Sequence, residues 1–208
     1  MKKYGVVGIV GRFKPLHLGG LAVLETLCEC SEMVKIGIGS ANMYDARNPF
    51  TAKESEEMIV FSLPTSCNNY TIIRLSDFGH LPEFRDGQKW RAHVKEQFGS
   101  LDALFSGNAY VRDILKEDYA IAPAHSVVPE EKHCPIKGSM IRFEMAKGTD
   151  AWKTLVPETV AKYLLEKNLV NRFQREFGLQ TLASVLETDP EKSETMGQEY
   201  AKITGEKK

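Results

Sequence analysis

The stretch that decides the fold is Tyr4-Gly-Val-Val-Gly-Ile-Val10, which continues directly into Gly11-Arg-Phe-Lys-Pro-Leu-His-Leu-Gly-Gly20. The short apolar run predicts a buried parallel strand. The segment after it opens a helix over Gly19–Cys30, whose leucines and valine recur at helical spacing. Glycines at such a turn let backbone amides approach a phosphate, and a helix N-terminus favours an anion. The stretch therefore predicts a strand, an anion-binding turn and a helix.

Strands and helices alternate through the rest of the chain. Further strands are predicted at Met33–Gly39, Tyr70–Leu75, Leu101–Phe105 and Ala120–Ala124. Further helices are predicted from the capping box Thr51–Glu54 to Leu63, around Trp90 to Phe98, and at Tyr110–Lys116, Gly138–Lys147, Pro157–Lys167 and Leu169–Leu186. This order predicts an α/β fold, a Rossmann-like doubly wound parallel sheet of about five strands with helices on both faces and additional C-terminal helices.

Composition limits the functional classes. Lys+Arg 27 against Asp+Glu 28 give a net charge of -1, which argues against a broad nucleic-acid or anionic-membrane surface. Apolar runs are far shorter than the ~20 residues of a membrane span, and the N-terminus has no signal-peptide pattern. Four cysteines at irregular spacings indicate reduced thiols rather than a zinc site, so we expect a soluble cytoplasmic protein without a protein-bound metal.

The turn after the first strand carries the most chemistry. Arg12 and Lys14 add positive charge, and His17 lies where an imidazole can donate to a phosphate oxygen. The pattern is neither the Walker loop nor the dinucleotide Gly-x-Gly-x-x-Gly motif. Without further motifs, a tight turn with a surface histidine explains it equally well.

Several segments together resemble one family. Gly-Arg-Phe-x-Pro-x-His-x-Gly after the first strand is similar to the hallmark of the His-x-Gly-His nucleotidyltransferases, and most similar to the archaeal-type nicotinamide-nucleotide adenylyltransferases. The resemblance continues, in the right order from about residue 4 to 170, through Ile38–Ala41, Arg47–Ala52, Phe105–Asn108 with Val111, Ile136–Arg142 and Asp150–Val160.

The resemblance implies transfer of AMP from ATP to nicotinamide mononucleotide (NMN), giving NAD and pyrophosphate, with Mg²⁺ on the phosphates. Arg12, Arg47 and Arg142 match positions that contact phosphates, and with His17 they form the implied catalytic set. The implied ATP-binding residues are Gly11, Arg12, Phe13, Lys14, His17, Gly19, Gly20, Gly107, Asn108, Val111, Ser139 and Arg142. Ser40, Asp77 and Trp90 are implied on the acceptor side, where Trp90 is alternatively a core anchor of its helix. His93 is expected to pack, and family members are often homo-oligomers.

The sequence departs from the family pattern in the first loop. The second histidine of the hallmark corresponds to Gly20, which offers only its backbone amide, so we expect a lower rate. Lys14 replaces a glutamine of the family, and we hypothesise that it supplies the missing positive charge. The segment from Asp77 to Trp90 is longer than usual, and Gly87 stands where the family has an asparagine.

These departures leave two alternatives beside NAD synthesis. One is an adenylyl- or cytidylyltransferase acting on another phosphorylated acceptor, suggested by the altered loop before Trp90. The other is a nucleotide-binding pseudoenzyme or sensor, suggested by Gly20. In either case we expect a nucleotidyltransferase domain over 1–170, a C-terminal helical extension over 171–186 and a polar, flexible tail over 187–208.

Overall fold

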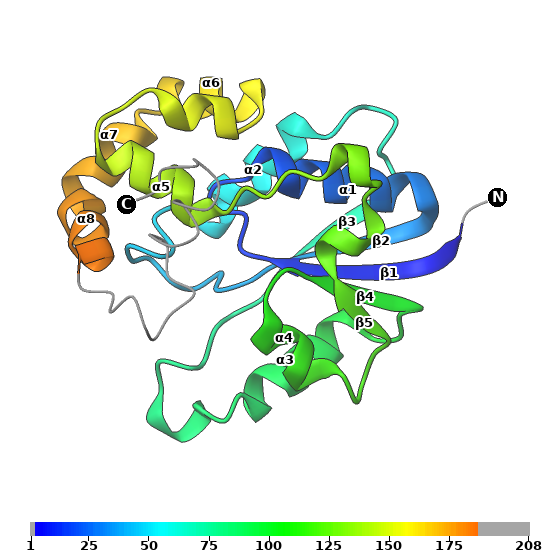
Figure 1. Cartoon of the computed structure of the whole chain (residues 1–208). Helices are drawn as coiled ribbons and strands as arrows, with labels where there is room; N and C mark the ends of the chain where they lie inside the picture. The colour runs from blue at the N-terminus through cyan, green and yellow to red at the C-terminus, as the bar shows by residue number, and fades with distance from the viewer. Residues whose placement is uncertain (1–2, 187–208) are drawn as a thin grey trace.

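The computed structural model describes residues 3–186 and contains one parallel sheet. Its 5 strands lie in the order β3-β2-β1-β4-β5, and every neighbouring pair is parallel (Figure 1). The strands are β1 (Tyr4–Gly11), β2 (Ser31–Ile38), β3 (Tyr70–Arg74), β4 (Ala103–Ser106) and β5 (Ile121–Pro123). The predicted doubly wound parallel sheet is confirmed.

Helices cover both faces of the sheet. In Figure 1, α1 (Leu18–Cys30) and α2 (Ala52–Ser62) lie above it, while α3 (Gln88–Phe98) and α4 (Ala109–Leu115) lie below. The later helices form a group beside the upper layer: α5 (Gly138–Ala146), α6 (Glu158–Glu166), α7 (Leu169–Phe173) and α8 (Leu179–Leu186). A π-helical turn, Gln174–Gly178, joins α7 to α8. Short 3-10 turns occupy Pro82–Phe84, Ala124–Val127, Glu130–Lys132 and Ala151–Leu155.

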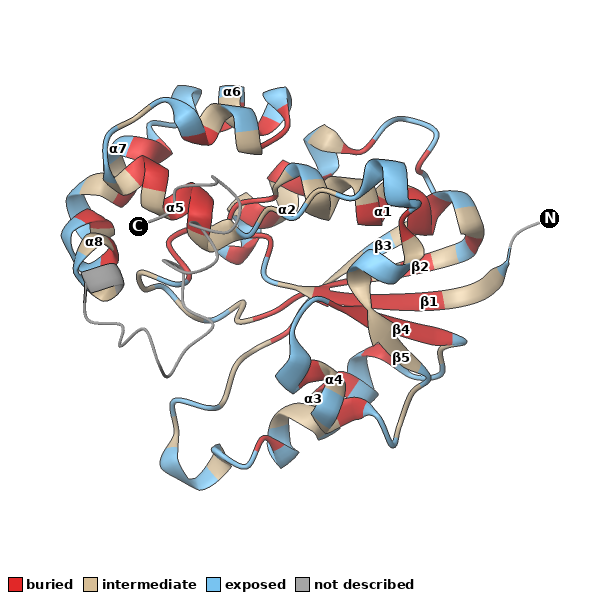
Figure 2. Cartoon of the chain, viewed as in Figure 1, coloured by how far each residue is buried: buried red, intermediate tan, exposed pale blue. Residues whose placement is uncertain are grey.

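Two hydrophobic clusters fill the space between sheet and helices. Val7 and Ile9 of β1 belong to the larger cluster on the α1 face, whereas Val10 belongs to a smaller cluster with Phe98 of α3. Alternate side chains of a strand point to opposite faces. Because both faces are covered, the central strands are buried along most of their length (Figure 2), which explains their nearly continuous apolar sequences.

The strand order reverses between β1 and β4. The chain runs from β1 outward to β2 and β3, then returns to place β4 on the other side of β1. Ligands of open α/β sheets bind outside the carboxyl ends of the strands at such a switch point. Val10 pairs with Ser106 there, so the loops after Gly11 and Ser106 are neighbours.

Some boundaries differ from the sequence prediction. β2 begins at Ser31, two residues earlier than expected, because Tyr4 of β1 pairs with Ser31 and the partner strand sets its start. The turn Ala151–Leu155 was not predicted. The predicted domain limit at residue 170 falls inside α7, and Phe173 is fully buried in the larger cluster. The predicted tail, 187–208, lies outside the described residues.

Candidate active site

His17 ends the first loop as the N-cap of α1. Its Nδ1 accepts a hydrogen bond of 2.9 Å from the Gly20 amide, in a β-region backbone conformation suited to capping. Burial lowers the pKa of His17 to about 4, so the imidazole is neutral at physiological pH. A neutral imidazole whose Nδ1 accepts carries its proton on Nε2. His17 therefore offers one fixed donor, as the sequence prediction requires.

Gly19 and Gly20 differ in the space around them. A Cβ on Gly19 would lie 2.4 Å from the Cys134 carbonyl oxygen, so only glycine allows that backbone to approach α1 this closely. A Cβ on Gly20 would meet the Leu16 side-chain tip at 3.3 Å and the His17 ring at 3.5 Å. Position 20 thus has room for a side chain in the first turn of the helix, and Gly19 does not.

Lys14 reaches the loop after β2, whereas the atoms nearest to a Cβ on Gly20 belong to Leu16 and His17. The hypothesis that Lys14 supplies positive charge in place of an imidazole stays a prediction. The Lys14 side chain is 2% exposed, and its Nζ donates to the carbonyl oxygens of Ser40 at 2.7 Å and Met43 at 3.4 Å. A lysine stem is long enough to cross from the first loop to the loop after β2, where two backbone carbonyls accept its protons. Burial lowers the pKa of Lys14 to about 8, although the nearby Asp45 acts in the opposite direction.

The three predicted phosphate-contacting arginines come together from separate parts of the sequence. Burial, followed by the charges of Arg12 and Arg47, lowers the pKa of Arg142 to about 9. Desolvation and the charge of Arg47 also lower the pKa of Arg12. No carboxylate among residues 3–186 forms an ion pair with these arginines or with Lys14. The three arginines together create a region of positive potential, which favours a polyanion.

Asp45 is a functional candidate that the sequence analysis missed. Its Oδ1 accepts from the Arg47 and Asn48 amides at 2.8 and 2.9 Å, which fixes the turn that carries Arg47. Its charge also raises the pKa of Arg12, Lys14 and Arg142 against the effect of burial. An aspartate side chain that accepts from the backbone amide two residues later forms an Asx-turn. Aspartate is common in such turns, so this local signal was present in the sequence.

The end of β4 forms the opposite wall of the switch point. Ser106 Oγ donates to the Val10 carbonyl oxygen at 3.0 Å and joins the two central strands. Gly107 is exposed and has open space beside it, and Asn108 caps α4 by accepting from the Tyr110 amide at 2.9 Å. Val111 is 8% exposed and packs in the smaller core cluster. The two exposed backbone positions, 107 and 108, are therefore the accessible part of this wall.

Two of the three predicted acceptor-side residues are in direct contact. Ser40 Oγ donates to Asp77 Oδ2 at 2.9 Å, and Asn42 exchanges hydrogen bonds with the Asp77 backbone at 2.9 and 2.6 Å. Trp90 instead lies partly buried against the smaller core cluster. The alternative interpretation of Trp90 as an anchor of its helix therefore agrees with its packing.

The loop before α3 explains one departure from the family pattern. Gly87 has a φ of 77°, and a Cβ there would lie 2.2 Å from the Tyr110 hydroxyl. The left-handed backbone favours glycine at position 87, and a larger residue there would require the Tyr110 side chain to move. His93, expected to pack, meets Phe78 edge-to-face at 5.6 Å between ring centroids.

Ser139 and Phe13 occupy supporting positions. Ser139 is the second residue of α5, and Lys137 takes the N-cap position without a side-chain capping bond. Phe13 is buried in the larger cluster with a φ of 52°. The Arg142 Nη1 donates to the Lys14 carbonyl oxygen at 3.0 Å, which ties α5 to the first loop.

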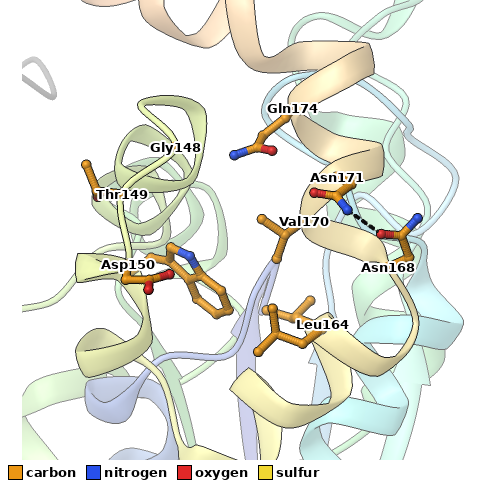
Figure 3. A pocket seen from close by; sticks show the side chains of 10 residues that line it. Gly148, Thr149, Asp150, Leu164, Asn168, Val170, Asn171 and Gln174 are labelled. Atoms are coloured by element: carbon orange, nitrogen blue, oxygen red, sulfur yellow. Dashed lines mark hydrogen bonds between the residues drawn. The ribbon is translucent and has the colours of Figure 1, made fainter.

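A separate cavity of about 280 Å³ lies at the other end of α5 (Figure 3). Its walls include Gly148, Leu164 and Val170, with Asn171 donating to Asn168 at its edge. None of the residues predicted to bind nucleotide or acceptor lines it. The cavity is therefore distinct from the candidate active site.

The described residues contain neither a metal-binding cluster nor a membrane-spanning helix. No group of three or more histidine, cysteine, aspartate or glutamate side chains within 3–186 is arranged to hold a metal ion. No helix in this part of the chain has the length and apolarity to cross a membrane.

Comparisons with known proteins agree with the family that the sequence motifs resemble. A scan against protein-family models finds no match. The chain is 32% identical over 167 residues to the nicotinamide-nucleotide adenylyltransferase of Methanosphaerula palustris, which covers 80% of this chain and 94% of that one. It is 34% identical over 167 residues to that of Methanocorpusculum labreanum, with the same coverages of 80% and 94%. For Pyrococcus furiosus the values are 32% over 171 residues, 79% and 85%.

Among solved structures, the chain matches a bifunctional NMN adenylyltransferase/ADP ribose pyrophosphatase of Francisella tularensis complexed with AMP and a manganese ion. The TM-score is 0.60 at 19% identity, over 88% of this chain and 55% of that one, so this chain spans little more than half of the bifunctional protein. The sheet order and this match define a Rossmann-like nucleotidyltransferase fold. The relatives identify the family within this fold. The chain belongs to the archaeal-type nicotinamide-nucleotide adenylyltransferases.

Proposed function

We propose that this chain transfers AMP from ATP to NMN, giving NAD and pyrophosphate. An oxygen of the NMN phosphate attacks the α-phosphorus of ATP, and the bond from that phosphorus to the α–β bridging oxygen breaks. The attacking oxygen is already anionic at neutral pH, so the step requires no general base. Catalysis then consists of positioning and stabilisation of charge.

The convergence of Arg12, Arg47 and Arg142 at the switch point is the observation that carries the proposal. These cations repel one another in the free protein, and a triphosphate relieves the repulsion while accepting their hydrogen bonds. In this proposal the three guanidiniums hold the phosphates, and His17 Nε2–H donates to an oxygen whose charge grows in the transition state.

The remaining residues orient the two substrates. Gly20 leaves room for the phosphates beside the first turn of α1, while Gly11 and Gly19 let neighbouring groups pack closely around that turn. Gly107 and Asn108 offer backbone and amide groups to the adenine side. Lys14 acts indirectly, since its ammonium fixes the loop after β2. Ser40 and Asp77 form the polar wall for the acceptor, and Trp90 supports α3 behind it.

Mg²⁺ fits the site as an ion carried by the nucleotide. The described residues form no cage for a metal, and Mg²⁺ is commonly bound by substrate phosphates and water with few protein ligands. When bound there, it neutralises charge on the departing pyrophosphate. The compartment we propose is the cytoplasm, which agrees with the free thiols of Cys30 and Cys134.

The test is incubation of the purified chain with Mg²⁺, ATP and a panel of acceptors, with NAD and pyrophosphate measured together. We expect stoichiometric NAD and pyrophosphate with NMN. Pyrophosphate with another phosphorylated acceptor, and none with NMN, would assign a different transferase reaction. ATP binding without pyrophosphate from any acceptor would leave a nucleotide-binding protein.

That last outcome is the second candidate function, and Gly20 favours it. The motif resemblance implies that Gly20 stands at the position of the second histidine of the hallmark. The side-chain atoms nearest to a Cβ there belong to Leu16 and the neutral His17. Gly20→His discriminates the two, because the substitution needs only a small shift of Leu16 and Lys14 does not fill the space. A slow enzyme should gain about tenfold or more in kcat with little change in ATP affinity. A protein without turnover in both forms is not an enzyme.

A further inference from the structure

Arg172 of α7 makes a partly buried contact with the start of α2. Its Nη1 donates to Glu54 Oε1 at 2.6 Å and its Nη2 to Glu54 Oε2 at 2.8 Å, while Nη2 also donates to the Pro49 carbonyl oxygen at 3.0 Å. The two side chains are only 24% and 15% exposed. This two-pronged geometry fixes both distance and orientation, unlike an exposed pair between flexible side chains.

Glu54 is also the residue that anchors the preceding loop. Its Oε2 accepts from the Thr51 amide at 2.8 Å, and the Thr51 hydroxyl accepts from the Glu54 amide at 3.2 Å, which completes a capping box. Burial favours the neutral acid, but hydrogen bonds from Arg172 and Thr51 prevail and lower the pKa of Glu54. Arg172 thus binds the same carboxylate that accepts from Thr51 in the capping box, directly after the loop over 40–51.

The same C-terminal segment holds the middle of this loop. The Tyr44 ring meets Phe177 edge-to-face with centroids 5.1 Å apart, and the Arg172 guanidinium lies 5.6 Å from the Tyr44 ring centroid. The Tyr44 hydroxyl donates to Glu176. Phe177 and Glu176 lie in the π-helical turn, a feature often found at functional sites.

The loop held in this way carries the cations of the candidate active site. Arg47 lies between Tyr44 and Pro49, and the Ser40 and Met43 carbonyls receive the Lys14 ammonium. The π-helical turn also reaches α5, because Gln174 Nε2 donates to the Met145 carbonyl oxygen at 2.7 Å. Arg142 is on that helix. One C-terminal segment therefore contacts the supports of both Arg47 and Arg142.

We infer that Arg172 is a positioning residue for the phosphate site, holding the loop over 40–51 through Glu54 and Pro49 so that Arg47 converges with Arg142. The inference rests on the proposed function for its kinetic consequence. It requires that residues after 170 belong to the working unit rather than to a separate extension.

The experiment compares Arg172→Met and Arg172→Lys with the parent chain in two assays. One is NAD synthesis with separate kcat and KM values for ATP and NMN, and the other is calorimetric titration with inorganic tripolyphosphate. We expect kcat/KM to fall about tenfold or more in Arg172→Met, since small misplacements of a catalytic group carry penalties of this size. Tripolyphosphate affinity should fall in parallel. Arg172→Lys keeps the charge but not the two-pronged contact, so it should fold like the parent and show an intermediate loss.

Arg74→Met is the matched control. Arg74 also binds a glutamate of α2, with Nε and Nη2 at 3.1 and 2.6 Å from Glu56 Oε2, but this pair is exposed and the Arg74 side chain donates to Glu56 rather than to the loop over 40–51. It should leave both assays unchanged. A double variant, Arg172→Met with Glu54→Gln, tests the route: because both residues act through one contact, the double variant should lose no more than the worse single variant.

The two assays separate failure of this inference from failure of the proposed function. A parent that binds tripolyphosphate but makes no NAD removes the proposed reaction, while weaker binding by folded Arg172 variants still supports the inference. Folded Arg172→Lys and Arg172→Met proteins with parental kcat, KM and tripolyphosphate affinity would overturn it. Additive losses in the double variant would also overturn the route through Glu54.

Discussion

The Arg142 guanidinium donates to the Lys14 carbonyl oxygen across 128 positions of sequence, over a distance of 3.0 Å. This bond joins α5 to the first loop without using a carboxylate. Arg142 is only 6% exposed, and its charge is therefore oriented but not neutralised by a protein acid. This hydrogen bond leaves the other N–H groups of the guanidinium available to bind an anion near the N-terminus of α1.

Arg142→Met should weaken ATP binding while the fold persists. One charge-assisted contact is lost, which corresponds to about 1.5–3 kcal/mol, or roughly ten- to 150-fold in Kd. Calorimetric titration with ATP measures the effect, and circular dichroism checks the fold. Arg175→Met is the control, since Arg175 is 71% exposed and pairs with its neighbour Glu176. Parental ATP affinity in a folded Arg142→Met protein would contradict the assignment.

Lys14 should make both stability and anion binding depend on alkaline pH. Its pKa is about 8 in the folded protein against an ordinary 10.5, so the unfolded chain binds more protons between these values. Stability of the unliganded parent relative to Lys14→Met should therefore rise as the pH increases from about 8 to 10.5. Tyrosine ionisation affects both proteins and cancels in the difference.

Anion affinity should move the opposite way over the same range, because loss of the Lys14 charge lowers the positive potential of the site and weakens the hold of Lys14 on the loop after β2. Urea unfolding and tripolyphosphate titration, each at several pH values, measure the two trends. A stability difference that stays constant with pH would show that Lys14 keeps an ordinary pKa.

His17→Asn separates the capping role of His17 from its role as a donor. Asparagine is among the best N-cap residues, so stability should change by less than about 1 kcal/mol. Its shorter side chain cannot replace the Nε2–H donor, and kcat should fall about 10²–10³-fold. Because the pKa of His17 is about 4, the parental kcat should show no His17 titration in the ordinary histidine range near 6.5. An inflection near that pH that disappears in His17→Asn would contradict a neutral imidazole.

Gly19→Ala and Gly20→Ala form a matched pair within one helical turn. Helix propensity favours alanine at both sites by about 1 kcal/mol. At position 19 the new Cβ collides with the Cys134 backbone at 2.4 Å, whereas at position 20 it meets a flexible leucine tip at 3.3 Å. We expect Gly19→Ala to lower unfolding free energy by about 1–3 kcal/mol and Gly20→Ala to be neutral or stabilising. Denaturant unfolding measures the two changes in unfolding free energy. Equal changes for Gly19→Ala and Gly20→Ala would refute the steric argument.

The parts of the fold that depend on local pattern were predictable. The apolar run to Val10 and the glycine-containing turn after it specify β1, the loop and α1, because strand period and turn chemistry act within a few residues. The capping box at Thr51 fixed the start of α2 for the same reason. The sequence singled out Arg12, Arg47 and Arg142 only through the motif resemblance, because no local pattern relates the three positions to one another.

Contacts made by long side chains across the fold were not predictable. Lys14 could reach several carbonyl groups from its loop, and only the packed structure directs it to Ser40 and Met43. The pairing of Arg172 with Glu54 spans 118 positions, and nothing in either local sequence identifies the partner. The π-helical turn likewise depends on packing against Tyr44 and α5 rather than on propensity.

The two hydrophobic clusters on opposite faces of the sheet are unequal in size. The larger one supports α1, α2 and the C-terminal helices, which together present the cations, whereas α3 and α4 rest on the smaller one. Hydrogen exchange should accordingly open the lower layer first. During divergence, the lower layer can accept substitutions without disturbing the larger cluster, which supports α5 and Arg142. Evolution of new acceptors in this lineage would then begin on one side of the sheet.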